Sequence, residues 1–146
     1  MNLPDEAATR AAGAALARTL EVGDVIALSG TLGAGKTSFA RGVIEALGFE
    51  GEVPSPTFPI VVPYAPPCVR LPVWHVDLYR IEDAEEAREL ALDEARQDGV
   101  LLIEWPERLG TSLWSDALCL KFTEAANGRH LTARVPPSWE TRWPAR

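Results

Sequence analysis

Residues 25–37 read Val-Ile-Ala-Leu-Ser-Gly-Thr-Leu-Gly-Ala-Gly-Lys-Thr, and this stretch decides the fold. A short apolar segment, residues 25–29, runs directly into the pattern G-x-x-x-x-G-K-T. The following residues, 38–47, carry apolar side chains at helical spacing and end before Gly48, which readily stops a helix. A strand, a glycine-rich loop and a helix in this order predict a phosphate-binding loop.

The composition of this loop suits a polyphosphate chain. Gly30, Gly33 and Gly35 lack Cβ atoms, so the backbone can adopt positive φ and turn several N–H groups inward. Lys36 supplies a mobile positive charge for the β- and γ-phosphates, and the hydroxyl of Thr37 can bind Mg²⁺. The positive end of the helix dipole lies at the same place. A turn without a ligand is the structural alternative, but it has no need for glycine, lysine and threonine in that order.

The overall composition excludes several classes of protein. With 146 residues, of which 47% are hydrophobic, we expect one domain, residues 1–146, with residues 136–146 as a tail of unassigned structure. A net charge of −7 argues against unaided binding to a nucleic-acid backbone, which needs clustered basic side chains. The two cysteines lack metal-ligand spacing, the N-terminus lacks an apolar signal sequence, and no segment has the ~20 apolar residues of a membrane span. We therefore expect a cytoplasmic protein with no membrane contact.

The rest of the pattern predicts an α/β fold. Residues 100–103 form a fully apolar run after Gly99, as expected for a central strand that is covered on both faces. Asn127-Gly128 favours a tight hairpin turn between the last two strands. We expect helices over residues 4–20 and 83–97, and strands over residues 60–62, 73–78, 100–103, 117–122 and 130–135. Together these elements predict a three-layer P-loop NTPase-like domain with a central, mostly parallel sheet and a C-terminal antiparallel hairpin.

A carboxylate is also expected near the phosphates, because the Mg²⁺ that accompanies a triphosphate needs a carboxylate held beside it, which Lys36 cannot supply. Glu104 directly follows the apolar run, which is the position of a Walker B acid, and Asp77 lies at the end of another predicted strand. Each acid has a structural alternative. Glu104 could be an exposed acid at a strand end, and Asp77 could form an ion pair with Arg80 or cap a turn.

Two interpretations remain open for several other side chains. Thr57 lies in a proline-bounded loop and is similar to switch threonines that reach the γ-phosphate and Mg²⁺, but Pro56 equally makes it an ordinary turn residue. His75 lies inside a predicted strand and is expected to be a hydrogen-bonded interior residue rather than a base. Trp139 and Trp143 in the tail are expected to pack against the core rather than stack on a nucleotide.

Four stretches of the sequence, taken in order, resemble the TsaE family of small bacterial P-loop ATPases in tRNA threonylcarbamoyladenosine biosynthesis. These stretches are residues 30–37, 55–58, 75–80 and 103–107. Asp-Leu-Tyr-Arg and Glu-Trp-Pro-Glu, within the last two, are far more specific than the glycine-rich loop. The resemblance implies ATP hydrolysis and assembly with the subunits TsaD and TsaB. It implies that tRNA is reached only through that complex.

The resemblance also implies a site for ATP or ADP with Mg²⁺. It places the nucleotide phosphates on Gly33, Ala34, Gly35, Lys36 and Thr37. Ser38 would lie near the α-phosphate and Thr9 near the base, while Mg²⁺ would bind beside Thr37 and Glu104. Lys36, Asp77, Glu104 and Thr57 form the implied catalytic set. The sequence marks no arginine as a finger, so we expect slow hydrolysis by the chain alone and acceleration by a partner.

Two other functions could use the same loop. A small-metabolite kinase would need a lid with arginines above its acceptor, and Arg70, Arg80 and Arg88 are too scattered to indicate one. A non-catalytic binding module would use the nucleotide only to set the shape of an interaction surface. For every alternative ATP is favoured over GTP, because the sequence has no Asn-Lys-x-Asp guanine-reading motif.

Overall fold

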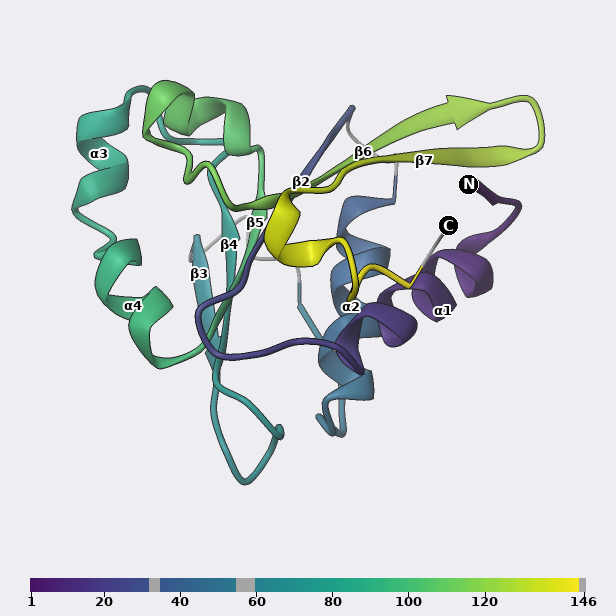
Figure 1. Cartoon of the computed structure of the whole chain (residues 1–146), viewed down its shortest axis with the longest axis horizontal. Helices are drawn as coiled ribbons and strands as arrows, with labels where there is room; N and C mark the ends of the chain where they lie inside the picture. The colour runs from purple at the N-terminus through teal and green to yellow at the C-terminus, as the bar shows by residue number, and fades with distance from the viewer. Residues whose placement is uncertain (32–34, 55–59, 145–146) are drawn as a thin grey trace.

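A central sheet with helices on both faces organises the chain in the computed structural model, which describes residues 1–31, 35–54 and 60–144 (Figure 1). The strands are β1 (Asn2–Leu3), β2 (Val25–Gly30), β3 (Val61–Tyr64), β4 (Val73–Asp77), β5 (Val100–Glu104), β6 (Leu118–Ala125) and β7 (Gly128–Arg134). The helices are α1 (Glu6–Ala17), α2 (Lys36–Ala46), α3 (Ala84–Arg88) and α4 (Leu92–Asp98), with the 3₁₀ segments η1 (Pro106–Ser112) and η2 (Pro137–Trp139). No helix among the described residues is both long enough and apolar enough to cross a membrane.

The strand order explains how one edge of the sheet can hold a site. In the described part of the chain the seven strands follow the order β1-β7-β6-β2-β5-β4-β3. The four central strands, β6, β2, β5 and β4, run parallel, whereas β3, β7 and β1 are antiparallel to their neighbours. The prediction of a largely parallel core with a C-terminal hairpin is therefore confirmed. Because parallel strands end on the same side, the residues after β2, β4 and β5 meet at one edge.

Each face of the sheet has its own apolar core. Helices α1 and α2 cover one face, and α3, α4 and η1 cover the other (Figure 1). The first core includes the fully buried side chains Leu16, Phe39 and Ile44, which lie against Ile26 and Leu28 of β2. The predicted three layers follow from this arrangement, with β2 and β5 covered on both sides.

Helices α1 and α2 cross with their backbones in direct contact. A Cβ atom built on Gly13 would lie 2.3 Å from the carbonyl oxygen of Phe39, and one on Gly42 would lie 2.2 Å from that of Arg10. Real Cβ atoms do not approach a backbone oxygen so closely, so only glycine permits this crossing. The contact fixes α2, and with it the start of the phosphate loop's helix, against α1.

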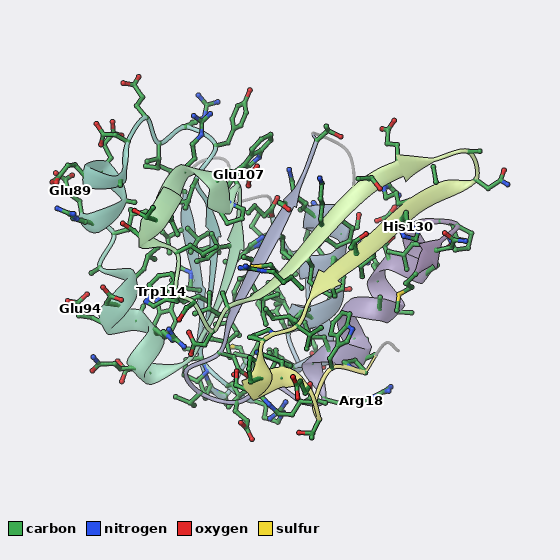
Figure 2. The ribbon with its side chains drawn as sticks, turned by 45° about the horizontal axis from the view of Figure 1, so that its top comes forward. Arg18, Glu89, Glu94, Glu107, Trp114 and His130 are labelled. Atoms are coloured by element: carbon green, nitrogen blue, oxygen red, sulfur yellow. The ribbon has the colours of Figure 1, made fainter. Side chains whose placement is uncertain are left out.

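The prediction of a single helix over residues 83–97 is wrong. Asp83 does cap a helix, since its side chain accepts from the N–H of Glu86 at 3.0 Å, but α3 ends at Arg88 and Ala91 adopts a left-handed φ of 55°. The break turns the chain so that Leu92 at the start of α4 is buried in the second core. Figure 2 shows Glu89 and Glu94, on either side of this break, pointing outward from the sheet.

The C-terminal tail is part of the first core, as the sequence predicted for its tryptophans. Trp139 is 1% exposed, and Trp143 packs against the same cluster. The guanidinium of Arg142 lies 3.9 Å from the centroid of the Trp139 ring and forms two hydrogen bonds, of 2.8 and 2.9 Å, to the carboxylate of Asp24. Because Asp24 directly precedes β2, the tail is attached to the end of that strand opposite the loop.

Candidate active site

The predicted phosphate loop begins and ends at glycines with positive φ. β2 ends at Gly30 with φ of 137°, where a Cβ atom would lie 2.4 Å from the carbonyl oxygen of Phe122. Gly35, with φ of 111°, is the N-cap of α2 and supplies no side-chain hydrogen bond to the helix. The first N–H groups of α2 are therefore not capped by Gly35, which suits them to an anion. Gly33 and Ala34, predicted to bind phosphate, lie outside the described residues.

Lys36 lies at the start of α2 and is almost completely buried. Its ammonium donates a hydrogen bond of 2.5 Å to the carbonyl oxygen of Gly30 and lies 3.9 Å from the centroid of the Trp105 ring. Burial lowers the pKa of Lys36, and the negative charges of Glu104, Glu107 and Asp77 partly counteract this effect. The predicted phosphate-binding cation thus stands between the loop and a group of carboxylates.

Thr37 and Glu104, the two residues predicted to lie beside Mg²⁺, contact each other directly. The hydroxyl of Thr37 lies 3.1 and 3.2 Å from the two carboxylate oxygens of Glu104. Glu104 is 3% exposed, and its Oε2 is also 2.7 Å from Nε2 of His75. The interpretation of Glu104 as an exposed acid at a strand end is therefore wrong, because the strand end itself is buried.

Asp77 is the Cα partner of Glu104 across β4 and β5. It is 7% exposed, and its Oδ1 accepts a hydrogen bond of 2.9 Å from the backbone N–H of Tyr79. The turn-cap alternative for Asp77 is thus observed. The same residue nevertheless lies beside the Walker B position, so the two readings are compatible.

The oxygen atoms at this edge fit Mg²⁺, which prefers carboxylate and hydroxyl oxygens and keeps ligands from water or phosphate. The structure brings together the Thr37 hydroxyl and the Glu104 carboxylate, with Asp77 on the adjacent strand. Within the described ranges there is no group of three or more His, Cys, Asp or Glu side chains that could hold a metal alone. At phosphate loops in general, phosphate oxygens and water complete the magnesium shell.

An arginine that the sequence did not mark also reaches this loop. A Cβ atom built on Gly35 would lie 2.8 Å from Cδ and 3.1 Å from Nε of Arg129, and 3.5 Å from Cγ2 of Thr9. Thr9 is fully buried in α1, and its hydroxyl bonds to the carbonyl oxygen of Asp5 at 3.2 Å. Arg129 belongs to β7, on the opposite side of β2 from Glu104, so the loop lies between these two oppositely charged side chains.

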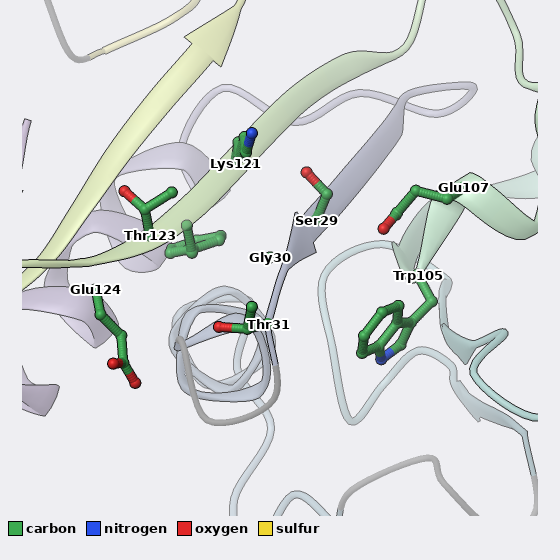
Figure 3. A pocket seen from close by; sticks show the side chains of 9 residues that line it. Ser29, Gly30, Thr31, Trp105, Glu107, Lys121, Thr123 and Glu124 are labelled. Carbon is green, nitrogen blue, oxygen red and sulfur yellow. The ribbon is translucent and has the colours of Figure 1, made fainter.

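A pocket of about 570 Å³ opens beside the loop. Figure 3 shows Trp105 and Glu107 on one side of it, Thr123 and Glu124 on the other, and Thr31 between them. Trp105 has a left-handed φ of 60°, which is unusual for a bulky residue and especially before a proline. Such strained residues cluster at functional sites, and here the strained backbone positions the indole above Lys36.

Most of the candidate residues predicted from the sequence meet at this edge. Lys36, Thr37 and Ser38 form the first turn of α2, with Gly35 before them and Thr9 beside them. Glu104 and Asp77 face the same turn from the strand ends. Thr57 lies outside the described residues. Sequence reasoning missed Arg129 and the partner of His75, since only the register of distant strands brings these side chains to the site.

Comparisons with known proteins point to one family. A family model described as threonylcarbamoyl adenosine biosynthesis protein TsaE matches residues 3–131. The chain is also similar to proteins named tRNA threonylcarbamoyladenosine biosynthesis protein TsaE. The one from Streptomyces coelicolor is 40% identical, and the match covers 84% of this chain and 87% of that protein. The one from Bacillus subtilis is 39% identical, and the match covers 85% of this chain and 75% of that protein. The crystal structure of Bacillus subtilis YdiB matches with a TM-score of 0.79 and 31% identity, covering 94% of this chain and 86% of that one.

Proposed function

The chain belongs to the TsaE family of threonylcarbamoyl adenosine biosynthesis proteins, and from this premise we propose that it binds and hydrolyses ATP with Mg²⁺ during that tRNA modification. One observation carries the proposal. The Thr37 hydroxyl contacts the Glu104 carboxylate at the start of α2, where Gly35 provides no side-chain cap, next to the buried ammonium of Lys36. A helix start, a lysine and a hydroxyl paired with an acid are the parts that bind a nucleoside triphosphate.

Each residue has a definite role in this proposal. The N–H groups at the start of α2 and the Lys36 ammonium bind the β- and γ-phosphates and stabilise the charge that develops on the leaving phosphate. Thr37 and Glu104 would hold Mg²⁺, which supplies charge neutralisation when bound. Asp77, beside Glu104 on β4, orients the attacking water. Thr57 is proposed to reach the γ-phosphate from its loop.

We further propose that hydrolysis is slow in the isolated chain and that the TsaD–TsaB complex accelerates it, with tRNA contacted only through that complex. Two features support this proposal. The negative charges of Glu104, Asp77 and Glu107 act on the ammonium of Lys36, so an added positive charge from a partner would be well placed there. The net charge of −7 also disfavours direct tRNA binding by the chain. Equal turnover with and without TsaD–TsaB would contradict the proposal.

The test compares Lys36→Ala with Arg18→Ala, which removes one positive charge from an exposed position far from the loop. Turnover of Mg-ATP should fall by about 10²–10³-fold in Lys36→Ala, since a preorganised phosphate contact is lost, and should be unchanged in Arg18→Ala. Calorimetry with Mg-ATP and Mg-ADP checks binding separately. A wild-type chain that releases no binding heat with either nucleotide would overturn the proposed function.

Glu104→Gln separates hydrolysis from the alternatives. We expect this variant to retain nucleotide binding and to lose turnover and support of tRNA modification, because the amide is a weaker magnesium ligand. Full tRNA modification by Glu104→Gln would instead favour a binding module that does not hydrolyse its nucleotide. Transfer of labelled γ-phosphate to a metabolite, rather than its release as free phosphate, would favour a kinase.

A further inference from the structure

His75 lies in the interior of the sheet, on β4, and its side chain is 0% exposed. From its contact with Glu104 we propose that His75 is a positioning residue, which fixes the Glu104 carboxylate toward Thr37 without itself touching nucleotide or metal. The inference rests on the proposed function, because it assigns a role inside the same site. It adds a residue of the strand interior that the sequence predicted only as a hydrogen-bonded core side chain.

The strand register makes this contact possible. On β4 and β5, Asp77 is paired with Glu104 and His75 with Leu102. His75 and Asp77 are two residues apart, so their side chains lie on the same face of the sheet. Side chains on one face of neighbouring strands can also meet across the diagonal, as those of His75 and Glu104 do here. Glu104 therefore has Asp77 directly opposite and His75 on the diagonal, where Oε2 meets Nε2 at 2.7 Å.

The hydrogen-bond inventory of the ring points to the same role. A carboxylate oxygen only accepts hydrogen bonds, so Nε2 of His75 must be the donor. Nδ1 is buried and has no hydrogen-bond partner within the part of the chain that the structure describes. A side chain kept only for packing would not leave a buried nitrogen unpaired, since an apolar residue fills such a position better. Within the described residues, the polar contact of the His75 ring is therefore the one from Nε2 to Glu104.

This hydrogen bond distinguishes the two oxygens of Glu104. The Thr37 hydroxyl is nearly equidistant from Oε1 and Oε2, at 3.1 and 3.2 Å, and so does not orient the carboxylate by itself. His75 engages Oε2, which leaves Oε1 as the better placed ligand for a cation beside Thr37. Hydrogen-bond partners of this kind orient metal ligands, and their loss typically lowers metal affinity or activity about 10–100-fold.

The experiment uses the full chain with ADP and measures Mn²⁺ affinity by electron paramagnetic resonance, and metal-free ADP affinity by calorimetry. His75→Leu removes the donor at similar volume, whereas His75→Gln retains an amide N–H close to the position of Nε2. We expect about 10–100-fold weaker Mn²⁺ binding in His75→Leu, recovery to near the wild-type value in His75→Gln, and unchanged metal-free ADP binding in both. If His75→Leu does not fold, His75→Asn takes its place, because its shorter amide cannot reach Glu104.

The outcomes separate this inference from the proposed function. Wild-type Mn²⁺ affinity in a folded His75→Leu or His75→Asn variant would overturn it. An equal loss of metal-free ADP affinity would also overturn it, since that result indicates a merely structural role. A wild-type chain that binds ADP without any dependence on metal would overturn the magnesium site itself, and a chain that binds no ADP would overturn the proposed function.

Discussion

The crossing of α1 and α2 allows a quantitative prediction for Gly13→Ala. In an exposed helix this substitution raises the free energy of unfolding by about 1 kcal/mol, because alanine has the higher helix propensity. Here the new Cβ would lie 2.3 Å from the carbonyl oxygen of Phe39 and 3.0 Å from the backbone nitrogen of Val43. Both are backbone atoms, which cannot rotate away as a side chain can. We therefore expect the substitution to destabilise the protein.

The size of the effect follows from two opposing contributions. Overpacking costs about 1–3 kcal/mol, and a clash with rigid backbone belongs at the upper end. After subtracting the gain of about 1 kcal/mol in helix propensity, the net loss is about 1–2 kcal/mol. For 146 residues the entropy of unfolding is about 0.3 kcal/mol per degree, so Tm should fall by about 3–7 °C.

Ala11→Gly is the matched control, because Ala11 is an exposed position of the same helix. It should lower the free energy of unfolding by about 1 kcal/mol through propensity alone. Urea titrations followed by circular dichroism measure both variants, and equal m-values show that the denatured states are comparable. An increase in Tm for Gly13→Ala would refute the reasoning, since it would mean that the helices separate without cost.

Three further predictions concern charged side chains. Arg129→Ala should weaken ADP binding about tenfold in calorimetry, as expected for losing a charged hydrogen bond, whereas Arg134→Ala, exposed on the same strand, should bind normally. Arg142→Ala should lower the free energy of unfolding in urea by about 2–4 kcal/mol, because it leaves Asp24 buried without its bidentate partner; a loss under about 0.5 kcal/mol would contradict this. Lys36→Met should raise Tm in the absence of nucleotide, because it removes a buried charge. For the same reason, the free energy of unfolding of the wild-type chain should increase as the pH rises from the lowered pKa of Lys36 toward its ordinary value. No gain over that range would show that burial of the ammonium has no cost.

Local pattern was sufficient to predict much of the fold and part of the site. The glycine-bounded turn between β2 and α2 was predictable because glycine, lysine and threonine stand there within one short segment. Glu104 was predictable because an acid directly after a fully apolar strand must lie at the end of a buried strand. For both residues, the decisive information lies within a few positions of the residue itself.

The features that the sequence did not predict depend on contacts between distant parts of the chain. Arg129 reaches Gly35 only because the β6–β7 hairpin and the parallel pairing of β6 with β2 bring it there. The bond from His75 to Glu104 depends on the diagonal register of β4 and β5. The break at Ala91 depends on the burial of Leu92, which the local helix signals do not contain.

The attachment of Arg142 and Trp139 near the start of β2 has a consequence for how the protein forms in the cell. During synthesis β2 leaves the ribosome early, but its neighbours β5 and β6, and the tail that seals the first core, follow much later. Contacts between such distant segments form slowly, and until then the exposed apolar strand is prone to aggregate. The strands that carry the candidate site therefore cannot complete their sheet and core until β6, β7 and the tail have been synthesised.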